Sequence, residues 1–233
     1  MSSIDTASEN EVATSPTIAE PPPKSFGQIA FGLAKYLSSL ATDENRDRAK
    51  LAALRRGLGK ENGWDPQLAS IVNPRIGDIA ERRTTICYQV AALFGLHPVG
   101  WPRASGDSDT ERYQNRTFGR SLHLYAVDKS KSSGTLEDIK QPLDRRLMAL
   151  LNADSDDVFD HLRYAVSLLR GTEIPVDWGK LMLDLDRWDE PDRSVQRTWS
   201  RAWWPAPPWV DGGTGVPSSE STTSGGMDAE AGA

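Results

Sequence analysis

The stretch "DWGKLMLDLDRWDEPDRSVQRTWSRAWW", residues 177–204, concentrates tryptophan more than any other part of the chain. It holds five of the chain's eight tryptophans: Trp178, Trp188, Trp199, Trp203 and Trp204. Indoles gathered in this way either stack against flat partners such as nucleobases or pack two helices into a core. The spacing of the neighbouring apolar residues bears on which of the two applies.

Apolar residues three and four positions apart predict two helices in this stretch. The first apolar face consists of Trp178, Leu181, Leu185 and Trp188. A second helix is expected to restart at Glu190–Pro191, with an acid as its cap and a proline in its first turn. We therefore predict that Trp178, Trp188 and Trp199 are buried, as large aromatics at core spacing usually are. Trp203 and Trp204 are adjacent, so both cannot face inward, whereas Asp184 and Arg187 predict a surface ion pair.

The same helical period extends through residues 24–204 and predicts an all-α fold, a two-lobed helical bundle of roughly eight to ten helices. We expect an N-terminal helical lobe over 24–103 and a C-terminal helical lobe over 112–204, divided by the polar stretch "PRASGDSDTE" at 102–111. Residues 1–23 and 205–233 are rich in Ser, Thr, Pro, Gly and acids without apolar periodicity. These two segments are expected to be disordered acidic tails.

Local signals give further expectations for the ends of helices. Thr42 is expected to cap the second helix and Gly57 to stop it in the left-handed region. Asp65–Pro66 predicts a helix start, and Asn73–Pro74 predicts a break. "KSKSSG" at 129–134 is expected to be a mobile polar loop.

The segment "RYQNRTFGRSLHLYAV", which precedes that loop, fits two secondary structures. Leu122, Leu124 and Ala126 alternate as in a strand, whereas Phe118, Leu122 and Tyr125 fit a helix. No neighbouring segment offers a pairing strand, so a helix is favoured.

The formal net charge of −6 hides a basic body. Eight of the 33 acidic residues lie in the two tails, which contain no Lys or Arg, so residues 24–204 carry 25 acids against 27 bases. Nineteen of these bases are Arg, whose planar fork donates bidentately to phosphate. A genome of high GC content also enriches Arg, and one sequence does not separate the two explanations.

No catalytic constellation is present in the sequence. The three histidines are scattered without metal-ligand spacing, and no Walker loop, GxGxxG or GxSxG occurs. Asp184 and Asp186 point about 200° apart on a helix, which disfavours a shared magnesium ion and a nuclease function. The single cysteine, Cys87, lies in an apolar run and is expected to be a small buried hydrophobe. We expect no enzymatic activity, no cofactor and no metal.

The sequence also bears on where the protein works. No apolar run reaches the roughly 18 residues that cross a bilayer, and the N-terminus lacks a secretory pattern. A lone cysteine excludes a disulfide framework, so a cytoplasmic location without membrane contact is expected.

Arginines recur in doublets and in one helical stripe. The stripe is Arg193, Arg197 and Arg201, four residues apart each time, and doublets occur at 55–56, 82–83 and 145–146. These side chains either form a solvated face paired to nearby acids or contact phosphate. Together they predict sequence-indifferent contact with a nucleic-acid backbone.

Four motifs follow one another along the chain: "LAALRRGLG" (51–59), "TFGRSLHLYA" (117–126), "LDRRLMALLNADSDDVFDHLRYAVSLLRG" (143–171) and "VDWGKLMLDLDRWDEPDRSVQRTWSRAWW" (176–204). In this order and spacing they resemble the small subunit of the type I-E CRISPR Cascade complex, the CasB family. The resemblance covers about Phe26 to Trp204 and leaves only the tails outside. The chain departs from the family pattern at Ser155, where some members have a basic residue, and in a longer loop, 128–139, that carries Lys129 and Lys131.

The resemblance implies a non-catalytic, all-α subunit that packs in two copies with the large and backbone subunits of an RNA-guided surveillance complex. There it would support the CRISPR guide RNA paired with target DNA and help to hold the displaced strand. Residues that match basic positions of the family, and are therefore expected to bind nucleic acid, are Arg56, Arg120, Arg146 and Arg163. Secondary candidates are Arg55, Arg145, Arg193, Arg197 and Arg201. The alternative is a purely structural helical scaffold without direct nucleic-acid contact.

Overall fold

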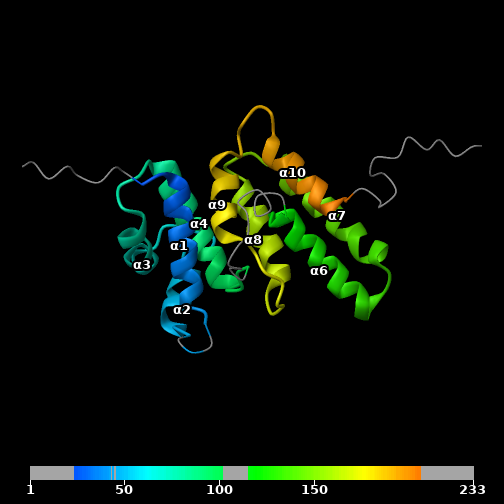
Figure 1. Cartoon of the computed structure of the whole chain (residues 1–233), viewed down its shortest axis with the longest axis horizontal. Coiled ribbons are helices and arrows are strands. Elements are labelled where there is room, and N and C mark those ends of the chain that lie inside the picture. Colours follow the sequence, from blue (N-terminus) through cyan, green and yellow to red (C-terminus); the bar gives the residue numbers. More distant parts are fainter. Residues whose placement is uncertain (1–23, 43, 45, 102–114, 206–233) are drawn as a thin grey trace, which may run out of the picture.

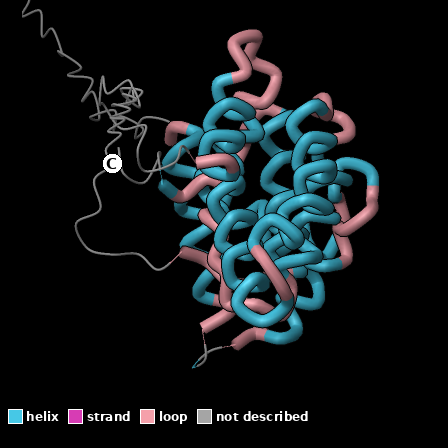
Figure 2. Tube along the Cα trace, turned by 90° about the vertical axis from the view of Figure 1, so that its right-hand side faces the viewer, coloured by secondary structure: helices cyan, strands magenta, loops and turns pink. Residues whose placement is uncertain are grey.

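The computed structural model describes residues 24–42, 44, 46–101 and 115–205, and this part of the chain is helical. Its helices are α1 (Phe26–Ser39), α2 (Arg48–Arg55), α3 (Pro66–Ile76), α4 (Glu81–Leu96), α6 (Phe118–Ser133), α7 (Leu136–Asn152), α8 (Val158–Leu169), α9 (Trp178–Asp186) and α10 (Ser194–Trp203), with the short 3-10 helix η2 (Glu61–Gly63). One isolated parallel bridge joins Gly100 to Val176. The predicted all-α fold is confirmed, since the described part of the tube in Figure 2 is coloured as helix and loop. The described helices fall within the expected number.

The helices form two groups that meet at α4, α8 and α9 (Figure 1). Within the first group α4 packs against α1, α2 and α3, and within the second α6 packs against α7 and α10. Helix α9 packs against α1 and α4 although it follows α6 to α8 in the chain. The two-lobe division at 102–111 stays a prediction, because that segment, like both predicted tails apart from Pro205, lies outside the described residues.

The tryptophans of the 177–204 stretch are mostly core residues, as predicted. Trp178, Trp188, Trp199 and Trp203 are buried, whereas the neighbouring Trp204 is 38 % exposed. Each buried indole N–H has an acceptor: Trp178 donates to the carbonyl of Val99, Trp188 to that of Ala153, Trp199 to the Asp184 carboxylate and Trp203 to the Asp144 carboxylate. The rings of Trp188 and Trp199 lie 5.1 Å apart and join α10 to the end of α9. Burial with satisfied N–H groups favours the packing interpretation of these four indoles.

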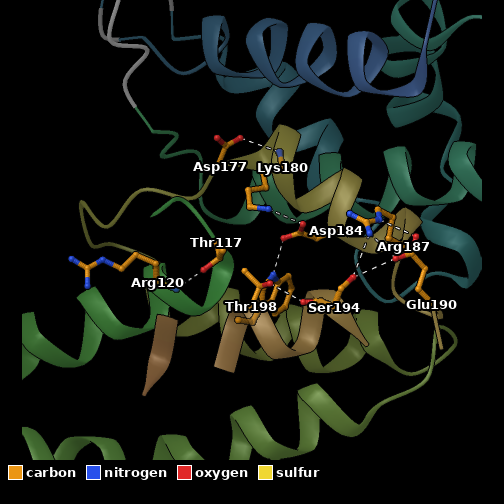
Figure 3. A network of polar contacts seen from close by, with 10 residues as sticks. Thr117, Arg120, Asp177, Lys180, Asp184, Arg187, Glu190, Ser194 and Thr198 are labelled. Atoms are coloured by element: carbon orange, nitrogen blue, oxygen red, sulfur yellow. Dashed lines mark hydrogen bonds and ion pairs between the residues drawn. The ribbon is translucent and has the colours of Figure 1, made fainter. Parts of the chain in front are cut away.

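Asp184 is not in a surface ion pair with Arg187, so that prediction is wrong. Asp184 is 7 % exposed; Lys180 Nζ donates to its Oδ1 at 2.9 Å, and Trp199 Nε1 donates to its Oδ2 at 2.7 Å. Burial raises the pKa of the Asp184 carboxyl, and the Lys180 ammonium opposes that shift. Arg187 instead pairs with Glu190 at 2.7 Å, beyond the end of α9 (Figure 3).

Two predicted helix ends near α2 are wrong. The side chain of Asp47, not that of Thr42, caps α2 by accepting from the backbone N–H of Lys50. The left-handed conformation belongs to Gly59 (φ 72°), two residues after the predicted Gly57. A Cβ on Gly57 would stand 2.5 Å from the Gly63 carbonyl oxygen, so Gly57 serves the close approach of two segments.

Asp65 caps α3 and Pro66 opens it, as predicted, but the helix does not break at Asn73–Pro74. It continues to Ile76, and the backbone N–H of Gly77 donates to the carbonyl of Asn73.

Two predictions in the second half of the chain also need correction. The segment 116–127 is helical from Phe118, as favoured, but α6 continues to Ser133, so most of the expected loop 129–134 is helix. The long loop predicted at 128–139 is therefore wrong: α6 runs to Ser133 and Thr135 already caps α7, so only a short turn joins the two helices. Helix α10 begins at Ser194 after a left-handed Arg193 (φ 49°), and Glu190–Pro191 lies in the preceding turn.

Candidate nucleic-acid interface

The nine predicted arginines lie at the surface of the described part of the chain. Arg120 is half-buried and the other eight are exposed. Of these nine, only Arg197 has a carboxylate oxygen within 4.0 Å among the described residues, that of Asp192 at 3.8 Å. Other arginines of the same molecule are paired closely: Arg82 with Asp189 at 2.8 Å and Arg83 with Asp186 at 2.9 Å. The predicted set is therefore largely unneutralised by close carboxylates.

Arg163 of α8 lies against the turn that follows α2. Arg55 is the last residue of α2 and Arg56 follows it as the cap. The guanidinium of Arg163 lies over Gly59, where an added Cβ would stand 2.6 Å from its Nη1. The two arginines that end α2 and the arginine of α8 thus belong to neighbouring segments, although they lie far apart in the sequence.

A cleft of about 710 Å³ adjoins this contact and is mixed in charge. Its basic lining is Lys60, Arg82 and Arg163, and its acidic lining is Glu61, Glu81, Asp156 and Asp160. Four acids against three bases do not mark this cleft as an anion site, so phosphate binding here would depend on the exposed guanidinium groups at its edge.

A second contact joins α7 to α8. The Cζ of Arg146 stands 4.6 Å from the centroid of the Tyr164 ring, a cation–π geometry. Tyr164 directly follows Arg163 and is 50 % exposed. Helix α8 therefore contacts α7 through Tyr164 and the turn after α2 through Arg163, and these two contacts lie in different hollows of the surface.

The stripe of Arg193, Arg197 and Arg201, on α10 and the residue before it, makes different contacts. Arg193 Nη2 donates to the carbonyl of Leu151 at the end of α7. Arg197 and Arg201 project from α10, which packs against α6. Arg120 on α6 points away from the polar network of α9 (Figure 3). No contact of the described residues joins these four side chains to Arg146 or Arg163, so the predicted residues do not form one continuous cluster of contacts.

Tyr164 is the residue at this surface that sequence reasoning missed. The buried face of α8 is Val158, Leu162, Ala165, Val166 and Leu169, and Tyr164 lies outside it. An aromatic residue off the apolar stripe and beside a family-matched arginine was a signal available in the sequence.

The residues weighed for catalysis or metal binding are buried or paired with other residues of the fold. Cys87 is buried, and desolvation raises its pKa to about 12. Burial also lowers the pKa of His97, whose Nε2 lies 2.7 Å from the carbonyl oxygen of Ile174. Of the acids weighed for a nuclease, Asp184 binds Lys180 and Trp199, and Asp189 pairs with Arg82. Across the described ranges, no group of three or more His, Cys, Asp or Glu is placed to hold a metal ion, and no helix has the length and apolar character needed to span a membrane.

Comparison with known proteins identifies the family. A model of the family described as CRISPR-associated protein Cse2 matches residues 50–204, which include all nine predicted arginines. The chain belongs to the Cse2 family. The CRISPR-associated protein Cse2 of Thermus thermophilus is 32 % identical over 160 residues, covering 68 % of this chain and 80 % of that protein. The resemblance to the CasB family is thereby confirmed.

Solved structures agree with this Cse2 assignment. The crystal structure of CasB from Thermus thermophilus has a TM-score of 0.54 at 29 % identity, covering 76 % of this chain and 98 % of that one. A chain of a CRISPR RNA-guided surveillance complex has a TM-score of 0.55 at 26 % identity, covering 77 % and 92 %. The Cse2 chain is therefore similar over most of its described length to a protein solved within such a complex.

Proposed function

We propose that this Cse2 chain is a non-catalytic small subunit of a cytoplasmic type I-E CRISPR surveillance complex, where its arginines bind nucleic-acid backbones. Its partners would be the large and backbone subunits, a second copy of itself, the guide RNA and the target DNA with its displaced strand. The contacts would stabilise the guide–target duplex and the open strand without reading base identity.

The observation that carries the proposal is the state of the family-matched arginines. Arg56, Arg146 and Arg163 are exposed, and within the described residues no carboxylate oxygen lies within 4.0 Å of them. Guanidinium groups in this state retain their donors for phosphate oxygens, to which they bind bidentately. Contacts of this kind depend on salt rather than on sequence, as the proposed role requires.

A structural scaffold without nucleic-acid contact is the second candidate. The paired arginines favour it for their own part of the molecule, since Arg82 and Arg83 join α4 to the end of α9 through Asp189 and Asp186. A scaffold role does not account for the exposed arginines at the end of α2 and on α7 and α8, which connect no helices through carboxylates.

The test replaces Arg56, Arg146 and Arg163 together by Ala in the assembled complex and titrates DNA retention against salt. Each lost phosphate contact removes about 0.7 from the slope of log affinity against log salt on single strands. We expect the slope to fall by about 2 and the affinity at low salt to fall with it.

A matched control removes three exposed cations that are each paired with a carboxylate. Lys50 pairs with Asp47 at 2.9 Å, Arg187 pairs with Glu190 at 2.7 Å, and Arg82 pairs with Asp189 at 2.8 Å. Replacing these three by Ala changes the net charge by the same amount and is expected to leave the slope near the wild-type value. Equal slopes for all three proteins would contradict the site, and an assembled complex that retains no nucleic acid at all would favour the scaffold.

A further inference from the structure

A groove between α7 and α8 carries an exposed aromatic ring. It is a hollow of about 320 Å³ that also reaches α6 and the end of α10. Its floor is apolar and consists of Leu122, Leu143, Leu147, Leu150, Ala165, Leu168 and Trp203. Arg145, Arg146, His161 and Tyr164 line it as well. We call it the Tyr164 groove.

Tyr164 does not serve the core. Half of the side chain is exposed, and it stands off the face by which α8 packs into the molecule. Among the exposed large hydrophobic residues of the described part, Trp64, Leu136, Met148 and Trp204 do not line this groove. A flat ring held at an apolar hollow satisfies the requirement for stacking against another flat group.

The charges around the ring select the kind of partner. The Arg146 guanidinium lies over the ring and Arg145 lines the same groove, whereas Arg163 points to Gly59 and lines the other cleft. Neither Arg145 nor Arg146 has a carboxylate oxygen within 4.0 Å among the described residues. A ligand that is apolar and planar at one end and anionic at the other is complementary to this arrangement, and a nucleotide of a single strand has both features.

We propose that the Tyr164 groove takes an unstacked nucleobase of single-stranded nucleic acid, with the base on Tyr164 and the flanking phosphates on Arg145 and Arg146. The inference rests on the proposed function and adds a specific mode of contact to it. In a duplex the bases are stacked on one another, so the groove discriminates a displaced strand from paired DNA by shape and not by sequence.

The test measures binding of the full-length chain to a fluorescently labelled oligothymidylate and to a strand of equal length whose sugars carry no bases. Stacking and phosphate contacts separate cleanly, because only the latter depend on salt. On the oligothymidylate, Tyr164→Ala is expected to lose about 5- to 100-fold in affinity with an unchanged salt slope. On the abasic strand, wild type and variant are expected to bind equally, and Tyr164→Trp is expected to bind both strands as wild type does.

Trp64→Ala provides the matched control, since Trp64 is 54 % exposed and lies outside the groove. It is expected to keep wild-type affinity. An equal loss by Tyr164→Ala on both strands, or a slope changed as in Arg146→Ala, would show that Tyr164 only positions Arg146 and would overturn the base site. Full affinity of Tyr164→Ala for oligothymidylate, while the wild type shows normal salt-dependent binding, would overturn the base site and leave the proposed function standing. A wild-type chain that binds neither strand, alone or in the complex, would overturn both.

Discussion

The buried pair of Lys180 and Asp184 gives the sharpest test of how the core is built. Lys180 is 5 % exposed and Asp184 is 7 % exposed, and Lys180 Nζ donates to Asp184 Oδ1 at 2.9 Å. In Lys180→Met the methylenes are roughly conserved, but the carboxylate loses its ammonium partner inside the protein. Breaking a buried pair in this way costs about 3–5 kcal/mol when the remaining group stays charged.

The cost should depend on pH, because Asp184 can escape the penalty by taking up a proton. Burial already raises the pKa of Asp184 in the wild type, and without Lys180 the hydrogen bond from Trp199 is what still opposes that shift, while the nearby Asp177 carboxylate adds to it. A carboxyl whose pKa is raised on folding contributes its stability below the unfolded pKa, near about 4, and loses it as the pH rises through the folded pKa. The destabilisation of Lys180→Met should therefore be small near pH 4 and grow towards pH 8.

Urea unfolding of wild type and variant at a series of pH values measures this difference in the free energy of unfolding. The double variant Lys180→Met, Asp184→Asn removes both members of the pair and leaves Asp177 as the nearby ionisable group. Its amide oxygen still accepts from Trp199 Nε1, so the pH dependence that comes from Asp184 should disappear. Lys35→Met, at an exposed position of α1, should stay within about 0.5 kcal/mol of wild type. A Lys180→Met variant equally destabilised at pH 5 and pH 8 would refute the reasoning.

Two further outcomes follow from the packing. Gly119→Ala would place a Cβ against the Trp199 carbonyl oxygen and should lower the free energy of unfolding by about 1–3 kcal/mol. Gly32→Ala, with open space around it, should raise the free energy of unfolding by roughly 0.5–1 kcal/mol. Urea midpoints that rank the two variants the other way would contradict the α6–α10 contact. Cys87 is fully buried and its pKa is raised to about 12, so it should react with iodoacetamide at pH 8 only after denaturation. Mass spectrometry of native and urea-unfolded protein measures this difference. Rapid labelling of the native protein would mean that α4 opens.

The helical period predicted the core of this molecule because one apolar face per helix is a local property of the sequence. Trp178 and Trp199 are buried where the spacing placed them. Asp184 escaped prediction because its hydrogen-bond donors come from two helices, with Trp199 of α10 reaching across to α9. A carboxylate beside an apolar stripe looks exposed until the packing of a second helix is known.

Composition misled at the end of α6. Ser130, Ser132 and the lysines beside them are typical of a loop, yet the hydroxyls donate to the carbonyls of Val127 and Lys129, three residues earlier, within the helix. Gly57 misled in another way, since its requirement is the approach of Gly63 and Leu68 rather than a left-handed backbone. The requirement at Gly57 comes from contacts with segments outside α2 and the turn that follows it.

The candidate surface was predictable residue by residue but not as an arrangement. Family-matched positions made Arg146 and Arg163 candidates, whereas the contact of Arg146 with Tyr164 follows from the packing of α7 on α8. The separate position of the Arg193, Arg197 and Arg201 stripe follows from the packing of α10 on α6. Helix packing angles decide which faces meet, and they are not local properties.

The lack of carboxylate partners for these arginines discriminates between the two candidate functions more strongly than the number of arginines does. Residues 24–204 contain 25 acids, enough to neutralise most of the 27 bases. Where arginine connects helices, as Arg83 does from α4 to Asp186, a carboxylate is placed within 2.9 Å. Exposed ion pairs contribute only about 0–1 kcal/mol each, so stability neither demands nor forbids them at the end of α2 and on α7 and α8. Among the described residues, the arginines at the end of α2 and on α7 and α8 lack such ion pairs, so their positive charges repel one another in the free protein. Binding of a polyanion would compensate this repulsion. A scaffold that never meets nucleic acid would not require such unpaired charge.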